Sequence, residues 1–223
     1  HPIRHIGNNA FESSGITSVI IPASVTSIGN RAFYLAASLA SVTFATGSGL
    51  DSIGDYAFQS TAITSVEIPA SVTSIGSGAF YYLATLTSIT FADIANSGLV
   101  TISNDAFRGT GISSITIPAS VTSIAQYAFM TVSLSSVTFL PSTDWTNGIT
   151  TFSANAFYET PLLDTIYITN GQKFNTTALT SSGSITNPYG HTGTVALIGL
   201  LTDNGVTYTY TIKSGTTTDV IIT

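Results

Sequence analysis

The sequence predicts a parallel β-solenoid, in which short strands stack rung upon rung, and two observations predict it. The block IPASVTSIGNRAF at 21–33 returns almost unchanged at 68–80 and at 117–129. An Ala-Phe pair also recurs at intervals of 22 to 28 residues, with its aromatic residue at Phe11, Phe33, Phe58, Phe80, Phe107, Phe129 and Phe157. A repeat of this length cannot bury its apolar face alone and must stack on its neighbours, so we expect about seven rungs.

The composition indicates a surface covered by hydroxyl groups rather than by charges. Only 7% of the 223 residues are charged, whereas 30 are serine and 37 are threonine. With five basic residues and a net charge of −6, the chain has no basic stripe, which argues against nucleic acid and anionic membranes as partners. No run of about 18 apolar residues predicts a transmembrane segment. The absence of cysteine removes thiol chemistry and cysteine-based zinc sites from consideration.

Each rung is expected to begin with a strand, because the pattern (I/L)xxVx(I/F) alternates between apolar and polar positions. The pattern occurs at 16–21, 39–44, 63–68, 86–91, 112–117, 134–139 and 163–168. Val19 and Ile21, with their equivalents in the other rungs, are predicted to point inward. The strands would then form a parallel sheet on one face of the solenoid.

The residues between these apolar positions are predicted to point outward, so that the exposed face of the sheet is a ladder of hydroxyl groups. This ladder is the candidate binding surface, formed by Ser41, Thr43, Ser65, Glu67, Ser88, Thr90, Ser114, Thr116, Ser136 and Thr138. Each strand has two outward positions, which form two columns along the ladder, and the column at the second position is interrupted by Ile20, Glu67 and Tyr167.

The rest of each rung is expected to turn a corner and return through the core. Pro22, Pro69 and Pro118 should end the strand in alternate rungs, because proline has no N–H to continue a ladder. The VTSI segment that follows sends its valine and isoleucine inward. The Ala-Phe pair then closes the rung, and the seven phenylalanines are predicted to stack into an aromatic spine that fills the core.

The other rungs replace the proline corner with loops of increasing length, at 45–52, 92–101 and 140–151. We expect these loops to emerge on one side of the solenoid, where insertions often bind partners, although turns rich in Gly, Asn, Asp and Ser are also simply solvated. Their candidate binding residues are Asp93, Asn96, Asp144, Trp145 and Asn147.

The period fails after Ile168, which places a boundary between a solenoid at 1–170 and a C-terminal β cap or assembly unit at 171–223. Asn204-Gly205 lies between two apolar or alternating runs and predicts a β-hairpin. We expect this hairpin to belong to a small antiparallel sheet. Its apolar face would close the C-terminal end of the solenoid or dock on the first rung of a neighbouring copy.

The repeat LTSVxIPxSVTSIGxxAF, carried in three strong and four looser copies over about residues 3–168, resembles the BspA-like leucine-rich repeats, also called the Treponema pallidum type. The resemblance implies a leucine-rich-repeat solenoid used outside the cell for adhesion or protein binding, and it implies no catalytic residue. Members of that family commonly carry a cysteine shortly after the Ala-Phe pair. Here Ser13, Thr61 and Thr110 stand near that place.

No arrangement of residues predicts catalysis. The three histidines, His1, His5 and His191, lie near the ends of the chain, so no base can be placed beside a serine or threonine nucleophile. The pairs Asp93/Asn96 and Asp144/Asn147 offer oxygen ligands without the carboxylate density of a dedicated calcium site. We therefore expect a protein that is not an enzyme and that has no catalytic residue, metal or cofactor.

The sequence leaves several non-enzymatic functions open. The first is a surface adhesin that binds another protein, and the second is a structural subunit that joins head to tail into a filament. The alternatives are glycan binding or ice binding through the Ser/Thr ladder or the loop ridge around Trp145. A Ser/Thr-rich surface poor in lysine, and a chain that opens with His1-Pro2, favour an extracellular or cell-surface location for a mature form without a signal peptide.

Overall fold

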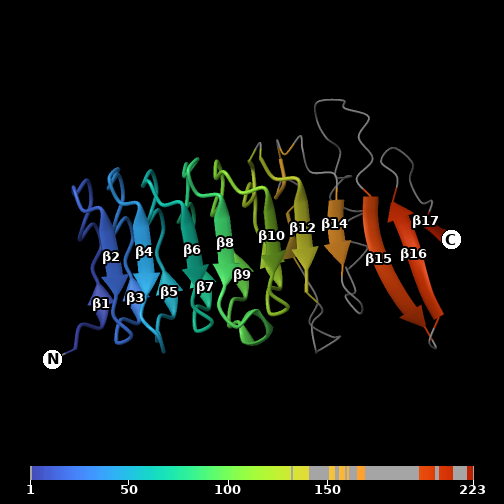
Figure 1. The fold of residues 1–223 in the computed structure, drawn as a ribbon, viewed down its shortest axis with the longest axis horizontal. Coiled ribbons are helices and arrows are strands. Elements are labelled where there is room, and N and C mark those ends of the chain that lie inside the picture. Colours follow the sequence, from blue (N-terminus) through green and yellow to red (C-terminus); the bar gives the residue numbers. More distant parts are fainter. Residues whose placement is uncertain are drawn as a thin grey trace.

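The computed structural model of the chain describes residues 2–131, 133–140, 151–153, 156–158, 160, 165–168, 196–203, 206–212 and 220–222. In this part the chain is an elongated β-solenoid with two layers of strands (Figure 1). The front layer holds strands of four residues: β2 (Ser18–Ile21), β4 (Ser41–Phe44), β6 (Ser65–Ile68), β8 (Ser88–Phe91), β10 (Ser114–Ile117), β12 (Ser136–Phe139) and β14 (Thr165–Ile168).

The back layer holds strands of only two residues, one in each rung. They are β1 (His5–Ile6), β3 (Ser27–Ile28), β5 (Ser52–Ile53), β7 (Ser74–Ile75), β9 (Thr101–Ile102), β11 (Ser123–Ile124) and β13 (Thr151–Phe152). All seven pair in parallel and form one continuous sheet. The described part therefore confirms the predicted solenoid and rung count, and it adds a second sheet where the sequence predicted only an inward-facing segment.

The front strands begin two residues later than predicted, at the serine rather than at the apolar residue before it. Leu39 and Leu86 are fully buried at the corner that precedes their strands. Within the strands the predicted alternation holds, with Val66 and Ile68 buried and Ser65 and Glu67 exposed. The register is in step as well, since Ser18 pairs with Ser41 and Ser65 with Ser88.

The front layer is not one continuous ladder, contrary to the prediction. We call the rungs of β2, β6, β10 and β14 odd, and those of β4, β8 and β12 even. Each odd strand pairs with the even strand that follows it, but β4 does not pair with β6 and β8 does not pair with β10. The two breaks fall where an even rung meets an odd rung that carries a proline.

Proline accounts for the position of these breaks. The residue after each even strand donates its N–H to the last carbonyl of the strand before, as Ala92 N does to Ile68 O at 2.9 Å. The equivalent donor opposite Phe44 is Pro69, which has no N–H, and Pro118 stands opposite Phe91. The third step confirms the rule, because Thr169 replaces the proline in the sequence and β12 pairs with β14.

The predicted phenylalanine spine runs through the core. Seven rings from Phe11 to Phe157 stack with centroid separations of 5.1–5.5 Å and interplanar angles of 3–16°. The five rings between Phe33 and Phe129 are fully buried, together with their alanine neighbours. Thr61 and Thr110, which follow the Ala-Phe pairs, donate their hydroxyl hydrogens to the carbonyls of Phe58 and Phe107.

A ladder of Asn and Asp side chains ties consecutive rungs together at one corner. The Oδ1 atom of Asn8 accepts the backbone N–H of Asn30, that of Asn30 accepts the N–H of Asp55, and that of Asp55 accepts the N–H of Ser77, at 2.8–2.9 Å. We call these residues the corner ladder. Sequence reasoning expected only a polar corner here and missed the ladder.

The C-terminal strands continue the front layer. β15 (Ala196–Asp203) pairs in parallel with β14, β16 (Val206–Ile212) pairs antiparallel with β15, and β17 (Val220–Ile222) pairs antiparallel with β16. The predicted hairpin is therefore present, with Asp203 opposite Val206. It meets the solenoid edge to edge through its backbone. The division of the chain at residue 170 stays a prediction.

Candidate binding face and groove

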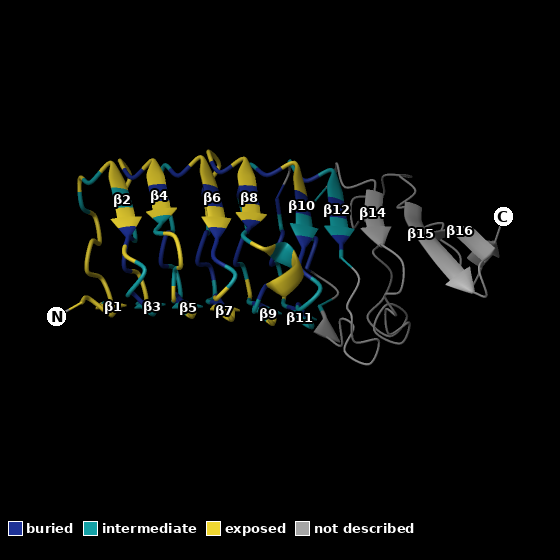
Figure 2. Cartoon of the chain, turned by 60° about the horizontal axis from the view of Figure 1, so that its bottom comes forward, coloured by how far each residue is buried: buried dark blue, intermediate teal, exposed yellow. Residues whose placement is uncertain are grey.

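The outward residues of the front strands form an exposed face, as predicted. The side chains of β2, β4, β6 and β8 that point outward are exposed, whereas Thr116, Ser136 and Thr138 farther along the solenoid are half-buried (Figure 2). We call this surface the hydroxyl face. Glu67 carries its only charge among the six front strands whose side chains are described, and Ile20 is its one large apolar side chain, 72% exposed.

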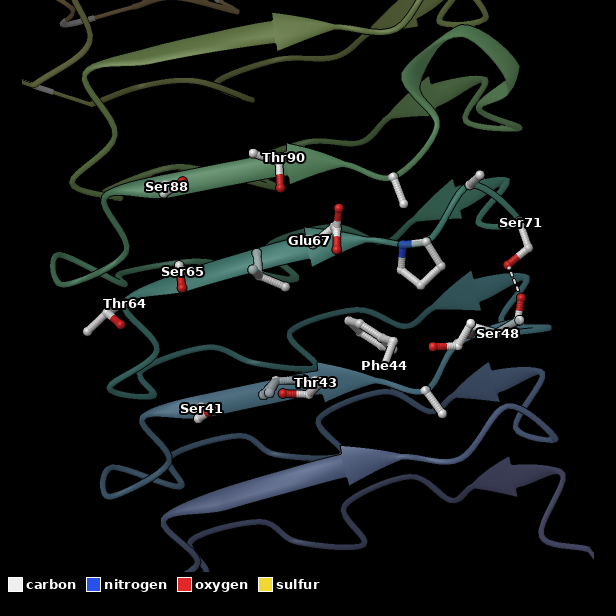
Figure 3. A pocket seen from close by; sticks show the side chains of 18 of the residues that line it. Ser41, Thr43, Phe44, Ser48, Thr64, Ser65, Glu67, Ser71, Ser88 and Thr90 are labelled. Carbon is white, nitrogen blue, oxygen red and sulfur yellow. Dashed lines mark hydrogen bonds between the residues drawn. The ribbon is translucent and has the colours of Figure 1, made fainter.

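An open groove of about 830 Å³ crosses this face along the break between β4 and β6. It brings together six of the predicted binding residues: Ser41, Thr43, Ser65, Glu67, Ser88 and Thr90. In Figure 3 the ring of Phe44 lies between β4 and β6, and Pro69 also lines the groove. The strands on either side are not joined by a ladder, and Phe44, which packs against the core, is only partly buried at this point.

The two breaks in the front layer differ in how well their phenylalanine is covered. Phe44 is only half-buried beside the first break, whereas Phe91, at the equivalent position beside the second break, is 7% exposed. The loop after Phe91 contains the 3₁₀-helix η1 (Ile94–Asn96), and Ile94 packs against the hydrophobic core. The loop after Phe44 is shorter and has no such residue.

Hydrogen bonds fasten the shorter loop at the end of the groove. The hydroxyl of Ser71 donates to the carbonyl oxygens of Ser48 at 3.0 Å and Leu50 at 2.6 Å, and Figure 3 shows the first of these bonds. The N–H of Gly49 also bonds to the carbonyl of Ala23, one rung before. The groove is therefore preformed, since its rim is held by the rungs on both sides.

The loop residues predicted for binding are not part of the groove. Asp93 and Asn96 are exposed, and the amide Nδ2 of Asn96 donates to both carboxylate oxygens of Asp93, at 3.1 and 3.0 Å. This pair braces the turn of η1. Asp144, Trp145 and Asn147 lie outside the described residues.

A second surface, which the sequence did not reveal, lies in the turns around the Ala-Phe pairs. The guanidinium of Arg31 lies over the rings of Tyr34 and Tyr56, and that of Arg108 lies over Tyr81 and Tyr127, all at 5.4–6.0 Å from the ring centroids. We call these six residues the Arg-Tyr ridge. Apart from the contact between Arg31 and Tyr34, these contacts join residues of different rungs, which only the stacking of the solenoid brings together.

The electrostatics of the ridge are mild. Arg108 forms a salt bridge to Asp105 at 3.0 Å, and this hydrogen bond raises the pKa of the guanidinium. Partial burial raises the pKa of the Tyr81 hydroxyl, and its hydrogen bond with Tyr82 acts in the same direction, while the charge of Arg108 opposes them. At neutral pH Tyr81 therefore stays neutral and Arg108 stays charged.

The described residues offer no built metal site and no membrane helix. No group of three or more His, Asp or Glu side chains gathers in this part of the chain. Nor does it contain any helix with the length and apolar character needed to cross a bilayer. What the geometry offers is a broad polar face with one groove.

These features define the class of protein, a β-solenoid of stacked leucine-rich repeats. The family model described as the BspA type leucine rich repeat region matches six copies, over residues 4–135 and 51–186. The chain belongs to this family. Its sequence matches none of the curated proteins with which it was compared.

Solved structures share the fold. The pneumococcal vaccine antigen PcpA is 24% identical, with a TM-score of 0.60, over 77% of this chain and 52% of that one. A leucine rich cell surface protein of Faecalibacterium prausnitzii is 25% identical, with a TM-score of 0.50, over 76% of this chain and 59% of that one. This chain therefore spans only a little over half of each of these two proteins.

Proposed function

We propose that this chain is a cell-surface or secreted module that binds other proteins and has no enzymatic activity. The single observation that carries the proposal is the hydroxyl face with its preformed groove. Solenoids present broad rigid surfaces of this kind to partners. Membership of the BspA-type family, and the likeness to a protein described as a cell surface protein, support the same reading.

The hydroxyl face suits protein recognition better than the other functions that the sequence left open. The two outward positions of each strand form two columns on this face. The column at the second position, mostly threonine, is interrupted by the isoleucine Ile20 and the carboxylate Glu67. The column at the first position consists of serine, which lacks the methyl group of threonine. A regular methyl-bearing array for ice is therefore not formed. Assembly into filaments and binding of glycans stay predictions.

The proposal is tested by measuring the binding of the immobilised chain to a panel of purified extracellular matrix proteins and to a glycan array. We expect binding to at least one protein. The double substitution Thr43→Lys/Thr90→Lys should weaken it at least tenfold, because both side chains line the groove. Ser74→Lys is the matched control, since Ser74 is exposed on the back layer and should leave binding unchanged.

Two results would overturn the proposal. One is the absence of any protein ligand in the panel together with specific glycan binding, which would favour the alternative function. The other is a protein ligand whose affinity falls equally with the front and the back substitution, because the hydroxyl face would then have no special part in binding.

A further inference from the structure

The chain itself indicates what the groove accepts, because it contains two versions of the same loop. The shorter loop runs from Phe44 to Leu50 and the longer from Phe91 to Leu99. Both begin with Phe-Ala and end with Ser-Gly-Leu. Both start beside a break in the front layer, and the proline of the next rung stands opposite each phenylalanine.

The two loops are fastened in the same way at their ends. Gly49 N donates to Ala23 O at 3.0 Å, and Gly98 N donates to Ala70 O at 2.8 Å. The N–H of the leucine that closes each loop bonds to the preceding serine hydroxyl at 3.3 Å in both cases. In sequence the loops differ only in their middle, where Thr46-Gly47 is replaced by the four residues 93–96.

The difference in the middle is an added aliphatic side chain. Ile94 packs against the core, and the phenylalanine of its rung is almost fully covered. The shorter loop has no aliphatic residue between Ala45 and Leu50, and Phe44 is left half-buried at the groove. The longer loop thus adds to the core an aliphatic side chain that the shorter loop lacks.

We propose that the groove between β4 and β6 takes an aliphatic side chain, of the size of isoleucine, from a partner protein that carries a lysine or arginine beside it. The basic residue pairs with Glu67, the only charge among the described side chains of the hydroxyl face, on a chain of net charge −6. The hydroxyls around the groove bond to the backbone of the same segment. This inference rests on the proposed function, and it names the chemistry of the partner.

The first experiment measures the binding of short synthetic peptides to the whole chain. Each peptide has one isoleucine and one lysine, separated by one to three Gly or Ser residues. Two control peptides match it, one with serine in place of the isoleucine and one with glutamate in place of the lysine. NMR shifts of the amides of Thr43, Phe44 and Glu67 report binding at the groove. We expect at least one isoleucine peptide to bind, and its serine match to bind about tenfold more weakly.

The second experiment closes the groove with the chain's own loop. Residues 45–49 are replaced by residues 92–98, which gives the first loop the equivalent of Ile94. This graft should abolish peptide binding. The matched control is the same graft with serine in place of that isoleucine, which has the same loop length and should keep peptide binding close to the native level. In the protein with its native loop, Glu67→Gln should remove the preference for the lysine peptide over the glutamate peptide.

The groove proposal is overturned if no peptide shifts these amides, if isoleucine and serine peptides bind equally, or if both grafts behave alike. Its failure is distinguishable from failure of the proposed function, because the grafts are also tested on the protein ligand from the panel. A ligand that binds the hydroxyl face while the isoleucine graft leaves its affinity unchanged would refute the groove proposal alone.

Discussion

At the scale of single residues, the phenylalanines of the spine are among the largest fully buried side chains of the core. Phe80 is fully buried between the rings of Phe58 and Phe107. We expect Phe80→Ala to lower the free energy of unfolding by about 3–5 kcal/mol, since it leaves a cavity with a stacked ring on either side. Chemical denaturation followed by circular dichroism measures the change.

Phe11 supplies the control for this prediction within the same chain. Its ring stacks on Phe33 alone and its side chain is 37% exposed. Phe11→Ala should therefore cost less than half as much as Phe80→Ala. Equal costs for the two substitutions would contradict the view that stacking between two rungs makes the spine important.

The corner ladder makes a second prediction at this scale. A Cβ atom added at Gly54 would lie 2.6 Å from the Oδ1 of Asn30 and 2.7 Å from its backbone N. Because the backbone cannot yield easily, Gly54→Ala should destabilise the fold by about 1–3 kcal/mol. Thermal unfolding of the variant measures this loss.

Gly15→Ala is the matched control for the corner ladder. A Cβ atom at Gly15 meets nothing within 4 Å, and its φ is not positive. We expect no loss of stability there, and a small gain is consistent with the reduced freedom of the unfolded chain. A melting temperature that falls equally for both variants would show that the ladder does not restrict the residue at Gly54.

At the scale of the elements, one missing hydrogen-bond donor separates the rung pairs of the front layer. Pro69→Ala restores an N–H opposite the carbonyl of Phe44, where Ala92 makes the equivalent bond in the next pair of rungs. The gain of about 0.5–1.5 kcal/mol from one hydrogen bond is offset by the lost rigidity of proline in the unfolded chain. Stability should thus change little, while the new amide at position 69 becomes protected from hydrogen exchange.

Pro22→Ala provides the comparison for this prediction. No four-residue strand precedes β2 among the described residues, so the new amide at position 22 has no ladder acceptor there. It should exchange fast. If position 69 exchanged as rapidly as position 22, proline would not be the cause of the break between β4 and β6.

The elements also show how far the sequence could predict the fold and the site. Alternation within a strand is a local pattern, so it correctly placed Ser65 and Glu67 outside and Val66 inside. This local pattern could not predict the breaks in the front layer, because they depend on which carbonyl of the neighbouring rung lies opposite Pro69. For the same reason the sequence predicted the hydroxyls around the groove but not the groove itself.

At the scale of the whole molecule, stability and recognition are divided between the inside and the outside of the coil. The core is a column of aromatic and aliphatic side chains, and the described charges on the front face reduce to Glu67. Because few ionised groups contribute to stability, we infer that contacts between rungs hold the solenoid together. The same contacts must then also protect its last rung. The last front strand needs a partner for its exposed edge.

In this structure the partner of β14 is β15, which pairs with it along the whole of both Thr165–Ile168 and Ala196–Gly199. Deleting residues 190–223 removes β15, β16 and β17 and leaves β14 with an open row of backbone N–H and C=O groups, the kind of edge that pairs with other chains. We expect the truncated protein to melt earlier and to associate, as measured by light scattering after size-exclusion chromatography. Deleting only 213–223 removes β17 and keeps β15 on β14, so this variant should keep a melting temperature closer to that of the full chain. If the truncation at 190 left both the melting temperature and the association unchanged, β15 would not protect the end of the solenoid. If the full chain formed an assembly and the truncated chain were a soluble monomer, the tail would instead dock on a neighbouring copy.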